Sequence, residues 1–137
     1  FLDQLKAHGL PVGPYNLPDW EESEGGLQEC LDSLFRITPP TAIFNDEMPL
    51  FVATHQHLSS RGIVAPRDVS LCCGDPDVAF DYCRPKVSHI SWDSQPLVRR
   101  IVKWANNISR GKNNCRQTSI KAHFVEGGTV GPAPKRD

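Results

Sequence analysis

Two aspartates stand where predicted strands give way to predicted helices. Asp46 follows the β-favouring run 41–44, and Asp75 follows the apolar run 69–73. A carboxylate at such a position can project into a cleft and accept paired hydrogen bonds from ligand hydroxyls. The alternative for both is helix capping, and Pro76 after Asp75 suits a cap with proline at the first helical position. The residues alone leave ligand binding and capping open.

Tryptophan could supply a flat apolar face to the same ligand. Trp20 follows a candidate helix cap, where an indole can stack on a sugar ring or a base. The structural alternative is partly buried packing, which applies equally to Trp92 and Trp104.

Other residue types that could do chemistry lack the spacing that chemistry needs. His55 and His57 are two apart on a predicted helix, so they point in different directions and cannot hold one metal. The five cysteines are an odd set without CxxC spacing, which favours neither disulfides nor zinc: Cys30, Cys72, Cys73, Cys83 and Cys115. GxSxG, HExxH, P-loop and GxGxxG motifs do not occur. We therefore expect no catalytic residue, no metal and no cofactor.

Composition and charge further narrow the class of protein to which the chain can belong. The 137 residues fit one domain, and 39% hydrophobic with 23% charged residues is ordinary globular composition. Because 15 basic residues balance 16 acidic ones, we do not expect this chain to bind nucleic acid. Arg99, Arg100 and Lys103 are expected on a solvated helix face. The sequence has no apolar run near the roughly 18 residues of a membrane span and no signal-peptide core, which predicts a cytoplasmic protein.

Helices and strands alternate along the predicted chain. The first segment ends a helix at Gly9, and residues 10–17 are predicted as an irregular or edge strand. Asp19 is predicted to cap the next helix, and Asn45-Asp46 to cap another that runs from Met48 to Gly62. Further predicted elements are strand 69–73, short helix 78–83, strand 87–91, a helix from Asp93 to Gly111 and strand 120–125.

This alternation predicts an α/β fold with a doubly wound, mostly parallel sheet. Ligands of such sheets bind beyond the carboxyl ends of the strands, where Asn45-Asp46 and Gly74-Asp75 are expected.

Three stretches together resemble the effector-binding domain of the lactose and galactose repressor family, which has the fold of type I periplasmic sugar-binding proteins. Residues 40–48 (PTAIFNDEM) are similar to the family's strand that ends in an Asn-Asp pair. Residues 62–71 (GIVAPRDVSL), running into Asp75, match its turn, buried strand and ligand-facing aspartate. Residues 85–90 with Asp93, and the closing Gly127-Gly128-Thr129, complete the match.

The resemblance implies a site and a dimer. Contacts to the effector would come from Trp20, Asn45 or Asp46, Asp75 and Trp92. The homodimer contact would include Met48, Leu50, Val78, Tyr82 and Cys83. The implied effector is a sugar, with a purine-like molecule as the alternative. Gly74, Pro76 and Gly127 depart from the family's usual aromatic, acidic and arginine residues.

The resemblance also implies that this is part of a two-lobe domain. Residues 1–92 would form the C-terminal lobe, 93–118 would cross to an N-terminal lobe, and 119–137 would return as a strand and tail. The apolar face of the crossing helix would then lack its usual partner. DNA would be bound only through a helix-turn-helix domain that precedes the lobes.

Two other functions fit parts of the sequence. A periplasmic-type sugar receptor shares the fold but would carry an export signal. A small α/β enzyme or phosphoacceptor domain could use Asp46 or Asp75, although the acidic cluster and lysine of a receiver domain cannot be assembled here.

Overall fold

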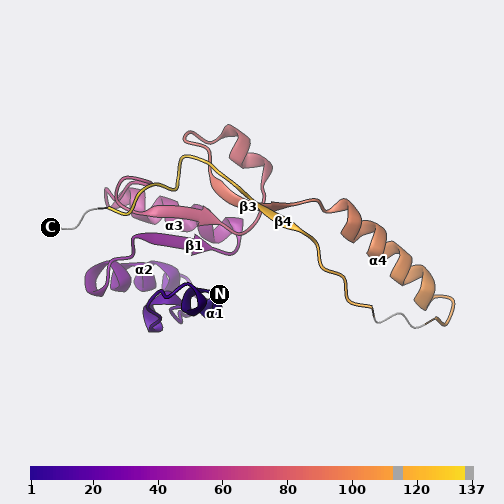
Figure 1. Ribbon diagram of the computed structural model, residues 1–137. Helices are drawn as coiled ribbons and strands as arrows, with labels where there is room; N and C mark the ends of the chain where they lie inside the picture. The colour runs from indigo at the N-terminus through magenta and orange to yellow at the C-terminus, as the bar shows by residue number, and fades with distance from the viewer. Residues whose placement is uncertain (113–115, 135–137) are drawn as a thin grey trace.

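The computed structural model describes residues 1–112 and 116–134 (Figure 1). Helices and strands alternate through most of the chain. In order they are α1 (Leu2–Ala7), η1 (Pro14–Asn16), α2 (Gly26–Ile37), β1 (Ala42–Asn45), α3 (Met48–Ser60), β2 (Ser70–Cys73), η2 (Val78–Tyr82), β3 (Ser88–Trp92), α4 (Gln95–Ile108) and β4 (Ala122–Val125), where η marks a 3-10 helix.

The strands form one mixed sheet in the order β1-β2-β3-β4. β1 and β2 pair in parallel, with Ala42 opposite Ser70 and Asn45 opposite Cys73. β3 is parallel to β2, and β4 is antiparallel to β3. The predicted mostly parallel sheet is confirmed, as is the predicted parallel pairing of 42–44 with 69–73.

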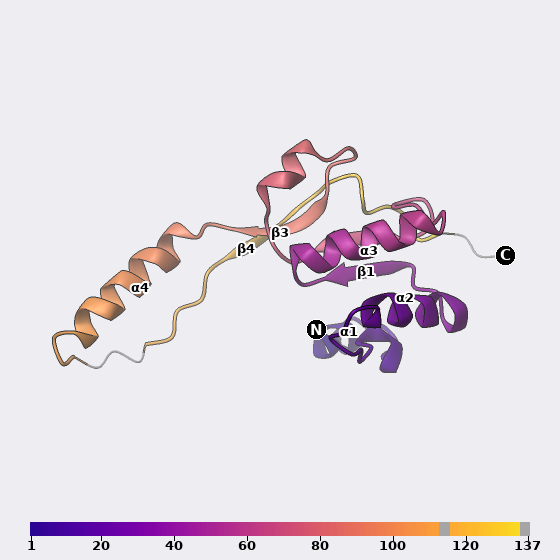
Figure 2. The ribbon, with the colours of Figure 1, turned by 180° about the vertical axis from the view of Figure 1, so that it is seen from behind.

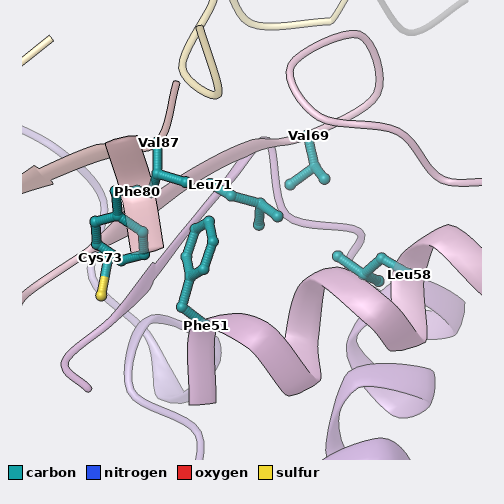
Figure 3. Packing of buried hydrophobic residues seen from close by; sticks show 7 residues of the cluster. All are labelled: Phe51, Leu58, Val69, Leu71, Cys73, Phe80 and Val87. Carbon is teal, nitrogen blue, oxygen red and sulfur yellow. The ribbon is translucent and has the colours of Figure 1, made fainter. Parts of the chain in front are cut away.

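The hydrophobic core lies between β2 and α3 (Figure 3). Every third or fourth residue of α3 faces the sheet, so Phe51 and Leu58 meet Leu71 across the interface. The rings of Phe51 and Phe80 pack edge to face with centroids 5.7 Å apart. The buried cluster consists of Phe51, Leu58, Val69, Leu71, Cys73, Phe80 and Val87.

The closing segment ties the two central strands together through Thr129. The buried hydroxyl of Thr129 accepts a hydrogen bond from Ser88 N (2.9 Å) and donates to the carbonyl of Leu71 (2.7 Å). Gly127 allows this approach, because a Cβ there would lie 2.4 Å from the carbonyl oxygen of Lys86. The departure from arginine at position 127 therefore has a steric reason.

Helix α4 projects away from the rest of the molecule in both views (Figures 1 and 2). None of its residues is buried. Its large apolar side chains stay 41–54% exposed: Leu97, Val98, Ile101, Val102, Trp104 and Ile108. Within the described residues, the apolar face of this amphipathic helix is left about half exposed, and Leu97 lines a shallow hollow together with residues 118–121.

Two predictions for the first third of the chain are wrong. Residues 10–17 form no strand; only Pro14–Asn16 make a 3-10 turn, because Pro11 and Pro14 cannot donate to a sheet. Asp19 does not cap α2, which begins at Gly26 after Gly25. Gly25 has φ +90°, a left-handed conformation that favours glycine, and it turns the chain into the helix.

Among the described residues, none of the helices combines the length and the hydropathy that a membrane span requires.

Candidate ligand-binding site

The carboxyl ends of β1 and β2 meet at one point of the sheet. Asn45 pairs with Cys73, and Gly74 N donates a hydrogen bond of 2.7 Å to the carbonyl of Asn45. A Cβ on Gly74 would lie 2.6 Å from the carbonyl oxygen of Asp46, so only glycine fits. The predicted neighbourhood of 45–46 and 74–75 is therefore present, and the absence of an aromatic residue at position 74 follows from it.

Asn45 is anchored beneath this junction. Its side chain is turned toward α3, where its Oδ1 accepts a hydrogen bond of 2.9 Å from the fully buried Thr54 hydroxyl. Its Nδ2 is buried and has no hydrogen-bond partner in the described part of the chain. Asn45 thus fixes the end of β1 to α3 and keeps one unused donor.

The capping interpretation of the two aspartates is wrong. The N-cap of α3 is Glu47, without a side-chain hydrogen bond, so Asp46 caps nothing. The N-cap of η2 is Asp77, whose Oδ1 accepts from Ala79 N at 2.8 Å. Asp75 lies two residues too early for that role, and its carboxylate makes no hydrogen bond or ion pair within the described ranges 1–112 and 116–134.

The surroundings of the two carboxylates differ. Asp46 is exposed, whereas Asp75 is half-buried. Burial raises the pKa of the neighbouring Cys72 and Cys73 thiols. For Cys73, a hydrogen bond from the backbone of Asp75 opposes this rise in pKa, and the negative charge of Asp75 adds to it. These thiols stay protonated near neutral pH and pack as apolar groups.

The two tryptophans lie on other segments of the chain than this junction. Trp92 ends β3, three residues beyond His89, which pairs with Cys73, so it is about 10 Å farther along the strand. Trp20 lies in the segment before α2. Both side chains are half-buried. The structure brings Asn45, Asp46 and Asp75 together at the ends of β1 and β2, and it places Trp92 farther along β3.

The residues predicted for a dimer contact are not equally accessible. Val78 is 79% and Tyr82 84% exposed on η2. Met48 and Cys83 pack against the core, and Leu50 is half-buried. The exposed pair on η2 is the accessible part of that set.

Two residues near the site were not predicted from the sequence. Thr54 shares a helix face with Phe51 and Leu58, so a hydroxyl within an apolar stripe was a signal for a buried polar partner. Asp77 stands directly before η2, the ordinary place for a cap.

In the described part of the chain, neither a hollow nor a metal-binding group points to another ligand site. Two shallow hollows of about 210 and 470 Å³ lie along α4, and neither is lined by the predicted ligand residues. Within the described residues, no group of His, Cys, Asp or Glu could hold a metal ion.

A mostly parallel sheet that packs against a helix and has polar residues at its carboxyl edge defines an α/β lobe. The chain belongs to the periplasmic binding protein-like domain family, whose model matches residues 1–130. Among curated protein sequences, none matches the chain.

Solved structures show the same fold in regulators of the LacI family. A putative LacI regulator from Bacillus cereus subsp. cytotoxis NVH 391-98 is 19% identical with a TM-score of 0.79, over 94% of this chain and 46% of that one. A LacI family regulator from Enterococcus faecium with bound ribose is 18% identical (TM-score 0.76; 95% and 49% covered). The regulator CelR in complex with cellobiose is 14% identical (TM-score 0.76; 93% and 39% covered).

The chain spans about half the length of these structures or somewhat less. The predicted resemblance to this part of the lactose repressor family is confirmed at the level of the fold and of the domain family.

Proposed function

We propose that this chain is the effector-binding lobe of a transcription regulator and that it binds a small polyhydroxylated ligand, most simply a sugar. The observation that carries the proposal is the pair Asp46 and Asp75 at the joined ends of β1 and β2, with neither carboxylate used as a helix cap. Two structurally similar regulators, one with bound ribose and one in complex with cellobiose, support the ligand class.

Each residue has a distinct part in this proposal. Asp75 and Asp46 accept hydrogen bonds from ligand hydroxyls, which are charge-assisted and therefore strong. Asn45 holds the strand end in place through Thr54 and offers its unused Nδ2 as a donor. Trp20 and Trp92 supply apolar faces for the ring once the site closes. No bond is made or broken, so the protein is not an enzyme.

Ligand occupancy would be transmitted by closure of two lobes. Residues 1–92 form the lobe proper, 93–118 cross to a second lobe and 119–137 return to the first. The homodimer would form through Met48, Leu50, Val78, Tyr82 and Cys83, and DNA would be bound by a separate helix-turn-helix domain. A regulator of this kind would act in the cytoplasm.

Calorimetric titration of the natural full-length protein tests this function. The probes are a panel of pentoses, hexoses and disaccharides, with purine bases as the other ligand class. We expect at least one sugar to bind and to change the affinity of the protein for its operator DNA. Binding of purines alone would replace the ligand class, whereas sugar binding without any effect on DNA would indicate a receptor instead of a regulator.

A further inference from the structure

Phe44 is an exposed aromatic residue next to the aspartates of the proposed site. It lies on β1, two residues before Asp46, and is 52% exposed. In the described part of the chain it belongs neither to the buried cluster nor to the side chains packed against it. The packing of the core therefore does not account for a phenylalanine at this position.

The ring of Phe44 lies on the face of the sheet opposite α3. Successive side chains of a strand point to opposite faces, and Ile43 packs against the core between the sheet and α3. Phe44 therefore points to the other face. Its partner on β2, Cys72, points the same way, because residues paired across two strands share a face.

Gly74 places the tip of this ring at the joined ends of β1 and β2. A Cβ on Gly74 would lie 3.0 Å from Cζ of Phe44 and 2.9 Å from Cα of Asp46. The ring tip and the backbone of Asp46 thus lie around one point, and Asp75 follows Gly74 directly. Because glycine carries no side chain, the ring reaches over position 74 from the neighbouring strand.

An aromatic ring beside carboxylates matches the two kinds of surface that a cyclic sugar offers. The hydroxyls at the edge of a sugar ring donate to carboxylates, whereas the C–H groups on its face are apolar. The face of a phenyl ring is negatively polarised and attracts such C–H groups. Small-molecule sites commonly combine aromatic walls with a few polar groups that fix the orientation of the ligand.

We propose that Phe44 is a specificity-determining residue of the ligand site, and that its ring stacks on the face of a cyclic sugar whose hydroxyls bind Asp46 and Asp75. This inference rests on the proposed function and deepens it, because it selects sugars with a closed ring over open-chain polyols. Trp20 and Trp92 lie on other segments, so Phe44 is the aromatic ring that β1 itself brings to the aspartates.

Replacement of the ring, with calorimetry and thermal melts of the natural full-length protein, tests the stacking. Phe44→Leu removes the ring but keeps an apolar side chain, and Phe44→Trp keeps a ring. Phe124→Leu is the matched control, because Phe124 is also 52% exposed but lies on β4, at the opposite edge of the sheet. The probes are the sugars of the ligand panel, among them D-ribose, D-glucose, D-galactose and cellobiose, and the open-chain alcohol D-glucitol.

We expect Phe44→Leu to bind the sugar at least about threefold more weakly, because aromatic contacts add to affinity beyond the area that they bury. Its affinity for D-glucitol should not fall, and its melting temperature should stay that of wild type. Phe124→Leu should bind as wild type does. Phe44→Trp should keep sugar binding and show a sugar-dependent change in fluorescence beyond that of the three natural tryptophans.

Wild-type sugar affinity in Phe44→Leu, or an equal loss in Phe124→Leu, would overturn the inference. So would a Phe44→Leu protein that melts earlier and loses affinity for the sugar and for D-glucitol alike, because the ring would then only support the fold. In each of these cases wild type still binds a sugar, so the proposed function stands. A wild-type protein that binds no sugar of the panel would contradict the proposed function itself.

Discussion

At the scale of single residues, short polar side chains decide how the ends of the strands are arranged. Asn45 and Thr54 form a buried pair that joins β1 to α3, and Thr129 joins β2 to β3. The hydrogen bonds of these side chains replace the hydrogen bonds to water that burial removes. The carboxylates of Asp46 and Asp75 stay outside these pairs, and the ligand that we propose would bind to them.

Removal of the Thr54 hydroxyl tests the buried pair. Thr54→Val keeps the shape but leaves the Asn45 amide without any partner, so we expect the free energy of unfolding to fall by about 1–3 kcal/mol. Urea denaturation measures it. Thr38→Val, at an exposed position just after α2, is the matched control. Equal effects of the two substitutions would contradict the role of Thr54.

Asp68 predicts a pH dependence at the turn before β2. The side-chain hydrogen bond from Arg67, with a second from Val64 N, lowers the pKa of Asp68 to about 2. Because the folded pKa lies below the unfolded one, near 3.9, this stabilisation is complete above about pH 4 and is lost as the pH falls toward 2.

Asp68→Asn should therefore be less stable than wild type at pH 6, and the difference should shrink between about pH 4 and pH 2. Thermal melts of the two proteins across that range measure it. A difference that stays constant with pH would show that the carboxylate charge contributes nothing.

At the scale of elements, the sheet and its covering helix carry the stability. Leu58 and Val52 lie on the same helix α3, but Leu58 is 2% exposed and Val52 52%. Leu58→Ala should cost about 2–5 kcal/mol through lost burial and a cavity. Val52→Ala should change stability by no more than about 0.5 kcal/mol. Chemical denaturation of the two variants measures these effects. Similar losses of stability for Leu58→Ala and Val52→Ala would contradict this packing.

Elements with a clear period could be predicted from the sequence, whereas those set by tertiary contacts could not. The buried run ending at Cys73 and the stripe of α3 predicted β2, α3 and their parallel neighbour β1. The start of α2 was misplaced, because the close approach of Gly26 to the Glu21 carbonyl is a three-dimensional contact. The burial of Asn45 depends on Thr54, nine residues on, and position in the sequence alone did not separate its role from that of Asp46.

At the scale of the whole molecule, the exposed residues of η2 offer a surface for the association of two copies of the protein. Val78 and Tyr82 are the accessible part of the predicted family dimer contact. In the homodimer that we propose for the natural full-length protein, Val78→Glu with Tyr82→Glu should weaken association at least about tenfold, because two charges would be buried without partners. Light scattering across a concentration series measures it. Ile37→Glu, 72% exposed at the end of α2, should leave the dimer intact, and loss of the dimer there would contradict the assignment.

The neighbouring aspartates Asp75 and Asp77 allow a matched test of the ligand binding that we propose for the lobe. Calorimetry and thermal melts of the natural full-length protein, with the sugar that the ligand panel identifies, are compared for wild type, Asp75→Ala and Asp77→Ala. We predict that Asp75→Ala loses about 1.5–3 kcal/mol of affinity, roughly 10- to 150-fold, with little change in melting temperature. Asp77→Ala should melt earlier because it removes the cap of η2, and it should bind as wild type does. Wild-type affinity in Asp75→Ala would contradict the account.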